Sequence, residues 1–295
     1  MPRLDVKQIP SVYKRARRLH SAGRTDAAEA LYRQILAIRP QTTEAHYQLA
    51  RLYGRNGRHA KALRSFEKAI AQKPGEAAIW ASLTETLLEW RDSSQVVGIS
   101  DRLVQAGHAR AVLALLTKLA DRFLKQGAAG LARPVIERAL KIAPGRPDLL
   151  TMLGDALSFL QAPDAALSSY DKAIAAAPGA DFPKIQKAVL LQTLGRFDDA
   201  ELLLREALEH APNNGRLFRL LTSGGKMTAG DPLIARMQET FAKPDLRPAD
   251  RIPLGFALAK ALEDIGAFDR VFPVLNVANG LVRKTFPYDI RTRTD

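Results

Sequence analysis

Side chains that could carry chemistry are few and widely separated in this sequence of 295 residues. There is no cysteine, which excludes disulfides, thiolate metal sites and a cysteine nucleophile. Histidine spacing typical of a zinc site is also absent. The five histidines fall in separate parts of the chain: His20, His46, His59, His108 and His210. The sequence therefore predicts no catalytic, cofactor-binding or metal site, and we expect no enzyme activity from these residues.

One short segment, Gly225 to Thr228, has some of the letters of a phosphate-binding loop. Leu220 stands where such a loop has its first glycine, no strand precedes the segment, and threonine does not directly follow Lys226. We interpret the segment as a turn between helices.

The composition is that of a folded chain with an excess of positive charge. Apolar residues make up 46% of it, which excludes a wholly disordered chain, and the formal net charge is +13. Residues 1–76 contain 16 basic and 6 acidic residues, so a charged partner is expected to bind there. The most apolar run, Ala111 to Leu116, is far shorter than the roughly 18 residues of a membrane span. We therefore expect a cytoplasmic protein with no signal peptide and no transmembrane segment.

A period of 34 residues organises most of the chain. Pro40 and Pro74 lie 34 residues apart, and the same interval separates Pro144, Pro178 and Pro212. Small residues recur at the eighth and twentieth positions of each period, with larger apolar residues at helical spacing beside them. Glycine at the fifteenth position can end one helix in the left-handed conformation, and proline at the thirty-second closes the next. Since unrelated helices with chance prolines would not reproduce this pattern five times, we predict repeated antiparallel helix pairs.

These positions resemble the tetratricopeptide repeat (TPR) family, whose period is also 34 residues. The resemblance implies an all-α fold, a right-handed TPR superhelix of antiparallel helix pairs, or α-solenoid. We place a TPR array over 1–214, a helical spacer over 215–251, a terminal TPR-like helix pair over 252–285, and a tail or linker over 286–295. The array has about six repeats: 9–42, 43–76, a degenerate copy at 77–112, 113–146, 147–180 and 181–214.

In TPR proteins the first helix of each pair lines a concave groove, and the resemblance maps that lining onto this sequence. The first two repeats contribute two tyrosines and three arginines: Tyr13, Arg17, Tyr47, Arg51 and Arg55. The next repeats contribute acidic residues, among them Glu85 and Glu89. Arginine binds carboxylates in bidentate geometry, so we predict that this end holds an acidic peptide segment or a chain-terminal carboxylate. The alternative is a solvated surface whose arginines pair with neighbouring acidic side chains.

Other partners have less support. The chaperone-binding TPR clamp expects lysine and asparagine where this chain has Tyr13 and Arg17. No nucleic-acid-binding motif accompanies the basic residues, so we do not expect nucleic acid as a partner, and an anionic membrane surface is equally unspecific.

The C-terminal part resembles the segment that joins TPR arrays to the catalytic domain in bacterial TPR-sulfotransferase proteins. The resemblance rests on Phe256 to Gly266, on Asn276 and Asn279, and on Phe286 to Asp289. It implies the non-catalytic arm of a sulfotransferase-like protein, although the donor-binding P-R-S-G-T-T-like loop of that family is matched nowhere in 1–295. Two explanations stay open, a chain cut before its enzyme domain and a natural protein without one, and the end just past the last helix favours the first. We predict a protein–protein interaction scaffold, with a free-standing cytoplasmic adaptor as the alternative and a homodimer as a possible state.

Overall fold

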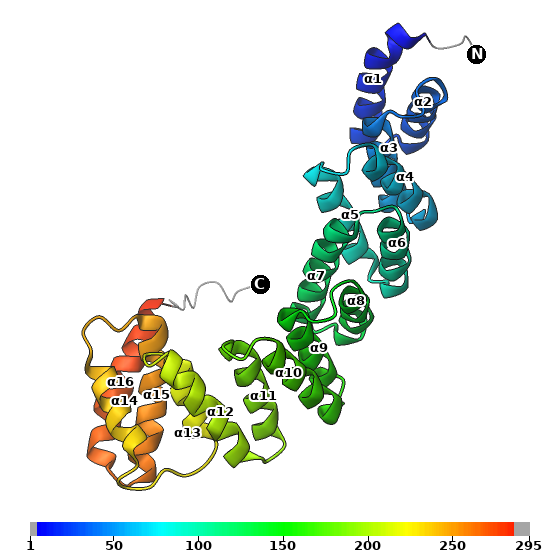
Figure 1. The fold of residues 1–295 in the computed structure, drawn as a ribbon. Coiled ribbons are helices and arrows are strands. Elements are labelled where there is room, and N and C mark those ends of the chain that lie inside the picture. The colour runs from blue at the N-terminus through cyan, green and yellow to red at the C-terminus, as the bar shows by residue number, and fades with distance from the viewer. Residues whose placement is uncertain (1–4, 286–295) are drawn as a thin grey trace. The chain divides into compact units, whose positions relative to one another are not determined.

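The computed structural model describes residues 5–285, and within that range it contains helices and no strand. The predicted all-α fold is confirmed, and within the first of its two units the helix pairs pack one after another (Figure 1). The chain divides into two compact units, Met1–Ala162 and Pro163–Asp295. Within residues 5–285, none of the helices is both long and apolar enough to cross a membrane. The tail or linker that we expect over 286–295 lies outside the described residues.

The first unit begins with a short 3-10 helix over Val6–Gln8. Its α-helices are α1 (Ile9–Ser21), α2 (Thr25–Ile38), α3 (Thr43–Arg55), α4 (His59–Gln72), α5 (Ala77–Trp90), α6 (Ser93–Gln105), α7 (Ala109–Lys125), α8 (Ala129–Ile142) and α9 (Pro147–Phe159). The second unit contains α10 (Pro163–Ala176), α11 (Asp181–Thr193), α12 (Phe197–His210), α13 (Gly215–Ser223), α14 (Pro232–Ala242), α15 (Pro248–Asp264) and α16 (Phe268–Thr285).

Helix pairs in the first unit turn at a residue with a positive φ angle. Three of these residues are glycines, Gly23, Gly57 and Gly127, with φ between 67° and 73°. Arg91, at 50°, and Gln161, at 58°, occupy the same place after α5 and α9. Because a side chain disfavours the left-handed conformation, these two turns hold strain that the glycine turns lack.

Small residues let the paired helices approach each other closely. Ala50 of α3 and Ala62 of α4 are fully buried, and so are the large rings of Tyr32 and Phe66 that fill the space beside such contacts. Prolines follow the second helix of a pair, as Pro40 does two residues after the end of α2. The core of the first unit is therefore a row of helix-to-helix contacts rather than one central cluster.

The third pair, α5 and α6, departs from this regularity. Val96 of α6 is fully buried where other pairs have alanine. Gly107, with φ at 90°, follows the end of α6, and α7 begins at Ala109 and runs for 17 residues. This copy therefore departs from the repeat pattern both at its small-residue position and at the turn that follows it.

In the second unit, α13 to α16 pack through close backbone contacts. A Cβ atom on Gly215 would lie 1.9 Å from the carbonyl oxygen of Asp250, so the start of α13 rests directly on the backbone of α15. A Cβ atom on Gly255 would lie 2.8 Å from the Cβ of Ala278, which brings α15 against α16. Glycine at these two positions allows α13 and α16 to pack tightly against α15.

Candidate functional site

The five predicted groove residues lie on two neighbouring first helices of the first unit. Tyr13 and Arg17 belong to α1, whereas Tyr47, Arg51 and Arg55 belong to α3. The three α3 residues line one hollow of about 450 Å³, whose other wall is α5: Ala78, Ala81, Ser82, Glu85, Thr86 and Glu89. We call this the α3/α5 hollow. The structure thus brings Tyr47, Arg51 and Arg55 together and leaves the α1 pair outside the hollow.

Charges in the α3/α5 hollow are mixed. Arg51 and Arg55 face Glu85 and Glu89 across it, yet none of these arginines has a carboxylate within 4.0 Å among residues 5–285, and the same holds for Arg17. The guanidinium of Arg51 instead lies 5.7 Å from the ring centroid of Tyr47. The alternative expectation, a solvated surface with acidic side chains nearby, stays open, because Glu85 and Glu89 line the same hollow.

The phenol of Tyr32, on α2, is buried against two aromatic rings of α1. Tyr32 is fully buried, its ring centroid lies 6.0 Å from that of Tyr13 and 6.3 Å from that of His20, and its hydroxyl has no hydrogen-bond partner among the described residues. Burial raises the pKa of Tyr32 to about 12, while the charges of Arg17 and Arg51 oppose that rise. Both arginines therefore act on one buried group from two helices.

The same arginines also act on a histidine. Burial lowers the pKa of His20, and the charges of Arg51 and Arg55 lower it further. Arg51 and Arg55 share the α3/α5 hollow, and Arg17 lies on α1, which contacts α3. We call the surface that carries these three arginines the α1/α3 arginine surface.

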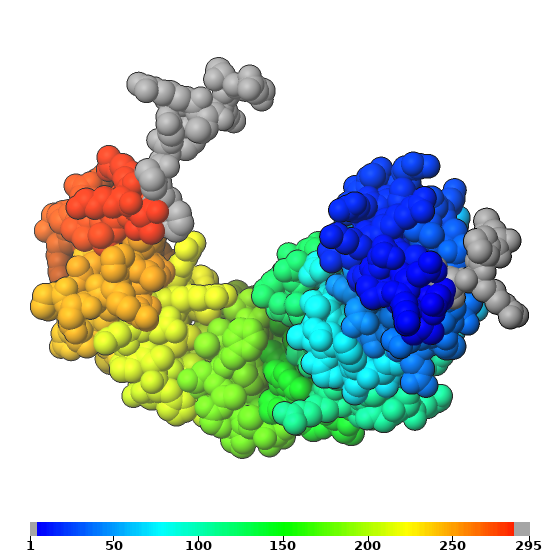
Figure 2. Space-filling model, turned by 90° about the horizontal axis from the view of Figure 1, so that it is seen from above, coloured from blue at the N-terminus to red at the C-terminus, as the bar shows by residue number. Residues whose placement is uncertain are grey.

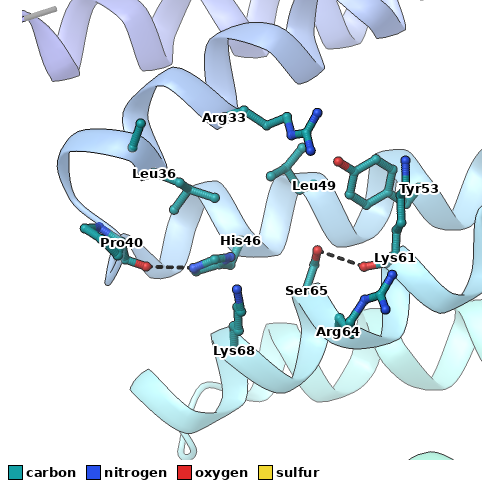
Figure 3. Close-up of a pocket in the computed structure, with 11 residues that line it drawn as sticks. Arg33, Leu36, Pro40, His46, Leu49, Tyr53, Lys61, Arg64, Ser65 and Lys68 are labelled. Atoms are coloured by element: carbon teal, nitrogen blue, oxygen red, sulfur yellow. Dashed lines mark hydrogen bonds between the residues drawn. The ribbon is translucent and has the colours of Figure 1, made fainter.

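Sequence reasoning missed a second basic surface on the second helices of the same two pairs. Figure 3 shows this pocket of about 430 Å³, which we call the α2/α4 pocket. Its lining is Arg33, Leu36, Ala37, Pro40, His46, Leu49, Tyr53, Lys61, Arg64, Ser65 and Lys68. The spacing of Lys61, Arg64 and Lys68, which puts three cations on one face of α4, was the available signal.

A buried carboxylate on α2, Glu29, contacts two residues that line the α2/α4 pocket, Tyr53 and Arg33. Glu29 is only 8% exposed, and it accepts hydrogen bonds from the Tyr53 hydroxyl at 2.8 Å and from Arg58 Nη1 at 2.6 Å. Arg33 approaches it to 3.7 Å. Burial raises the pKa of Tyr53 to about 12, and the hydrogen bond to Glu29 contributes to that rise. The negative charge of Glu29 is therefore already shared by its own neighbours.

Histidines in the described residues make structural contacts. His46 takes the place that tryptophan has in the next pair: His46 Nε2 donates to the Pro40 carbonyl at 2.8 Å, as Trp80 Nε1 does to that of Pro74 at 2.8 Å. The ring of His59 stacks on Trp90, with centroids 3.8 Å apart. Over residues 5–285 no group of three or more His, Cys, Asp or Glu side chains is placed to hold a metal ion.

Two protein-family models match parts of the sequence. One family model, described as tetratricopeptide repeat, matches residues 19–85 and 160–223, and a second model of the same description matches 117–181. Together these matches span more than half of the chain. No curated protein matches the sequence.

Solved structures of similar fold come from several organisms. BtubC from P. vanneervenii is 19% identical, with a TM-score of 0.53 over 72% of this chain and 96% of that one. MamA 41-end from Desulfovibrio magneticus RS-1 is 19% identical over 59% and 97%, with a TM-score of 0.47. A thermophilic TPR protein from Thermus thermophilus is 24% identical over 73% and 98%, with a TM-score of 0.32. At these identities the likeness concerns the fold alone.

Proposed function

This chain belongs to the tetratricopeptide repeat family, and we propose that it is a protein-interaction scaffold that holds an acidic segment of its partner on the α1/α3 arginine surface. Repeats of this family act as protein-binding modules, and the array carries no metal cluster within residues 5–285.

One observation carries the proposal: Arg17, Arg51 and Arg55 have no carboxylate within 4.0 Å among the described residues. Arginine pairs readily with carboxylates in bidentate geometry, and unpaired arginines next to tyrosines favour binding of an acidic ligand. Tyr13 on α1 and Tyr47 on α3 add rigid contact area on the same two helices. Carboxylates of a partner would complete pairs that the fold leaves open.

The charges of the α3/α5 hollow predict the orientation in which the ligand binds. Because Glu85 and Glu89 lie across the hollow from Arg51 and Arg55, the ligand's acidic residues belong over α1 and α3 and its basic residues over α5. A segment with a block of acidic residues followed by basic ones fits better than one of alternating charges.

The absence of native cysteine makes a site-specific test straightforward. Ala78, at the edge of the hollow, is exposed, so an Ala78→Cys variant can carry an environment-sensitive fluorophore. We expect a peptide of four glutamates followed by four lysines to bind more tightly than one of the same composition with alternating charges. Combining Arg17→Glu, Arg51→Glu and Arg55→Glu should weaken that binding at least 30-fold, since three attractions become repulsions.

A matched control changes the same charge elsewhere. Arg110→Glu, Lys118→Glu and Arg122→Glu lie on α7, away from the hollow, and should leave the affinity within about twofold, as expected for distant charges screened by salt. Unchanged binding in the α1/α3 variant, or an equal loss in the α7 control, would contradict the proposal. Free and amidated peptide C-termini distinguish a terminal carboxylate from side-chain carboxylates.

A second candidate role concerns the last helix of the second unit. Only Ala278 of α16 is buried, whereas Phe268 and Phe272 are 64% and 71% exposed, and Figure 2 shows α16 on an outer face of that unit. Large exposed apolar side chains on a terminal solenoid helix favour a neighbour that covers them. We therefore also propose that this helix pair docks on a further domain, as its resemblance to the TPR-sulfotransferase proteins suggests.

Sequencing the reading frame past the codon for Asp295 tests this second role. A continuation into a strand followed by a P-R-S-G-T-T-like loop would support the sulfotransferase link, and a stop codon would refute it. Sedimentation of the chain with and without Phe272→Ser separates this from the homodimer that we also expected. A dimer that dissociates in the variant would make a second copy the neighbour.

A further inference from the structure

We infer that the α2/α4 pocket is a second peptide-binding site, and that its ligand is an extended acidic segment with one apolar side chain between two carboxylates. The inference goes beyond the α1/α3 arginine surface, because the pocket is lined by α2, by α4 and by a different set of α3 residues. It uses the same protein-binding role of the family, but neither surface depends on the other for its argument.

Unlike the α3/α5 hollow, the pocket has only cations around its mouth. Lys61, Arg64 and Lys68 have no carboxylate within 4.0 Å among the described residues. Arg33 reaches Glu29, but that carboxylate also serves Arg58 and Tyr53. Four cations around one pocket repel each other, and a ligand with two or more negative charges would relieve that repulsion.

The positions of these cations leave an apolar middle. Figure 3 shows Lys68 beside His46 and Pro40 at one end of the pocket, and Lys61 and Arg64 beside Tyr53 at the other. Leu49, which is largely buried at the floor of the pocket, lies between the two ends, and Leu36 lies beside His46 at the Pro40 end. The order along the pocket is thus cation, apolar surface, cation.

Dimensions of the pocket suit an extended peptide. Lys61 and Lys68 are seven residues apart, so their backbones are separated by roughly 10 Å along α4. In an extended chain, side chains at positions i, i+2 and i+4 point the same way and span roughly 13 Å, which the flexible cation side chains can bridge. A pocket of about 430 Å³ has room for one large apolar side chain with its flanking groups. The ligand pattern is therefore carboxylate, apolar, carboxylate at alternate positions.

Two blocked peptides test this pattern: acetyl-Glu-Ser-Leu-Ser-Glu-amide and the same peptide with leucine replaced by serine. A fluorophore on Ala71→Cys, an exposed position one turn beyond Lys68, reports on the pocket. We expect the leucine peptide to bind at least 10-fold more tightly, because its apolar side chain is removed from water. Equal binding of both peptides would overturn the inference.

Two variants separate the charge from the apolar middle. Arg64→Glu with Lys68→Glu should abolish binding of the leucine peptide, whereas Arg110→Glu with Lys118→Glu on α7 should not change it. Ala37→Trp keeps every charge but fills the pocket, so it should weaken the leucine peptide at least 10-fold. Wild-type affinity in Ala37→Trp would show that the apolar side chain does not enter the pocket.

The experiment also distinguishes this site from the arginine surface and from nucleic acid. Arg51→Glu with Arg55→Glu should leave the leucine peptide unaffected, so failure of one site does not imply failure of the other. A single-stranded oligonucleotide that binds the Ala71→Cys reporter more tightly than the leucine peptide, and loses binding in Arg64→Glu with Lys68→Glu, would replace the peptide assignment with nucleic acid.

Discussion

The α1/α3 arginine surface and the α2/α4 pocket are built from the same two helix pairs, yet they distribute charge differently. On the first helices, arginines stand opposite Glu85 and Glu89 of α5. On the second helices, the cations around the pocket include Lys61, Arg64 and Lys68, and no acidic residue lines it. The excess of positive charge in residues 1–76 is therefore not one property of one surface. The acidic and basic residues must therefore be counted for each helix face separately before a ligand is assigned to that face.

Buried polar groups near the two surfaces differ as well. Glu29, beside the pocket residue Tyr53, accepts hydrogen bonds from Tyr53 and Arg58. Tyr32, beside Tyr13 of α1, has a hydroxyl with no partner among the described residues. A satisfied buried group contributes to stability, whereas an unsatisfied one costs free energy, so substitutions at these two positions should act in opposite directions.

The largest stability effect is expected at Glu29. Glu29→Ala removes the acceptor of Tyr53 and Arg58 and leaves their donors without partners in a partly buried place, which should cost about 3 kcal/mol of unfolding free energy. Urea unfolding monitored by circular dichroism measures the loss. A cost below about 1 kcal/mol would mean that this network contributes little to the stability of the fold.

The turn that joins the two surfaces should show the next largest effect. Gly57 lies between α3 and α4 with φ at 67°, and a Cβ atom there meets nothing within 4 Å. Gly57→Ala should therefore cost about 1 kcal/mol through backbone strain alone. Arg91→Gly should gain a similar amount, and the pair of variants measured by urea unfolding serves as its own control. Loss of stability in both would show that the turn residues act through contacts.

Neutralising Glu85 and Glu89 should strengthen binding at the α3/α5 hollow without changing binding at the α2/α4 pocket. Glu85→Gln with Glu89→Gln leaves only positive charges in the α3/α5 hollow. A purely acidic peptide should therefore bind there about fivefold more tightly, which corresponds to about 1 kcal/mol of binding free energy. The pocket should keep its affinity for the leucine peptide. Titrations with the Ala78→Cys and Ala71→Cys reporters measure the two changes separately, and an equal gain at both would contradict independent surfaces.

A histidine near each surface makes stability depend on pH. Burial lowers the pKa of His20 and of His46, so the folded chain binds fewer protons than the unfolded chain near the ordinary histidine pKa of about 6.5. Stability should therefore fall as the pH drops through 6.5 and through the lower folded values. Thermal unfolding at pH 7.5 and 5.5 measures the loss, which should be smaller in His20→Gln with His46→Gln. An undiminished loss in that variant would assign the pH dependence to other groups.

The smallest expected effect is at Tyr32. Tyr32→Phe removes a hydroxyl that has no partner among the described residues, so the protein should be unchanged or up to about 1 kcal/mol more stable. Urea unfolding beside Glu29→Ala gives the comparison directly. A loss above 1 kcal/mol would show that the hydroxyl is satisfied in solution.

Much of the fold could be predicted from sequence because the 34-residue period reflects packing that every pair shares. Buried alanines such as Ala50 and Ala62 and the glycine turn at Gly57 are visible as residue types. The turns at Arg91 and Gln161 were not predictable, since neither residue type indicates a positive φ. Which cations lack a partner was equally hidden, because that depends on carboxylates from other helices.

The candidate sites also combine features that are visible in the sequence with features that depend on packing. The family resemblance pointed to Arg51 and Arg55 on a first helix, and the structure places both in one hollow with Tyr47. The α2/α4 pocket was missed because cations on second helices resemble ordinary surface charge in a sequence. Only the packing of α2 against α3 and α4 shows that Leu49 lies between those cations, with Leu36 beside His46 at one end.

One parallel titration tests most directly whether the first unit binds protein segments through these two surfaces. Ala78→Cys and Ala71→Cys proteins, each labelled, would be titrated with the four-glutamate, four-lysine peptide and with the leucine peptide. We predict that the four-glutamate, four-lysine peptide changes the fluorescence at position 78 at a lower concentration than at position 71, and that the leucine peptide does the reverse. The assignment of two distinct binding surfaces is wrong if neither peptide changes the fluorescence of either reporter at millimolar concentration. It is also wrong if each peptide changes both reporters equally.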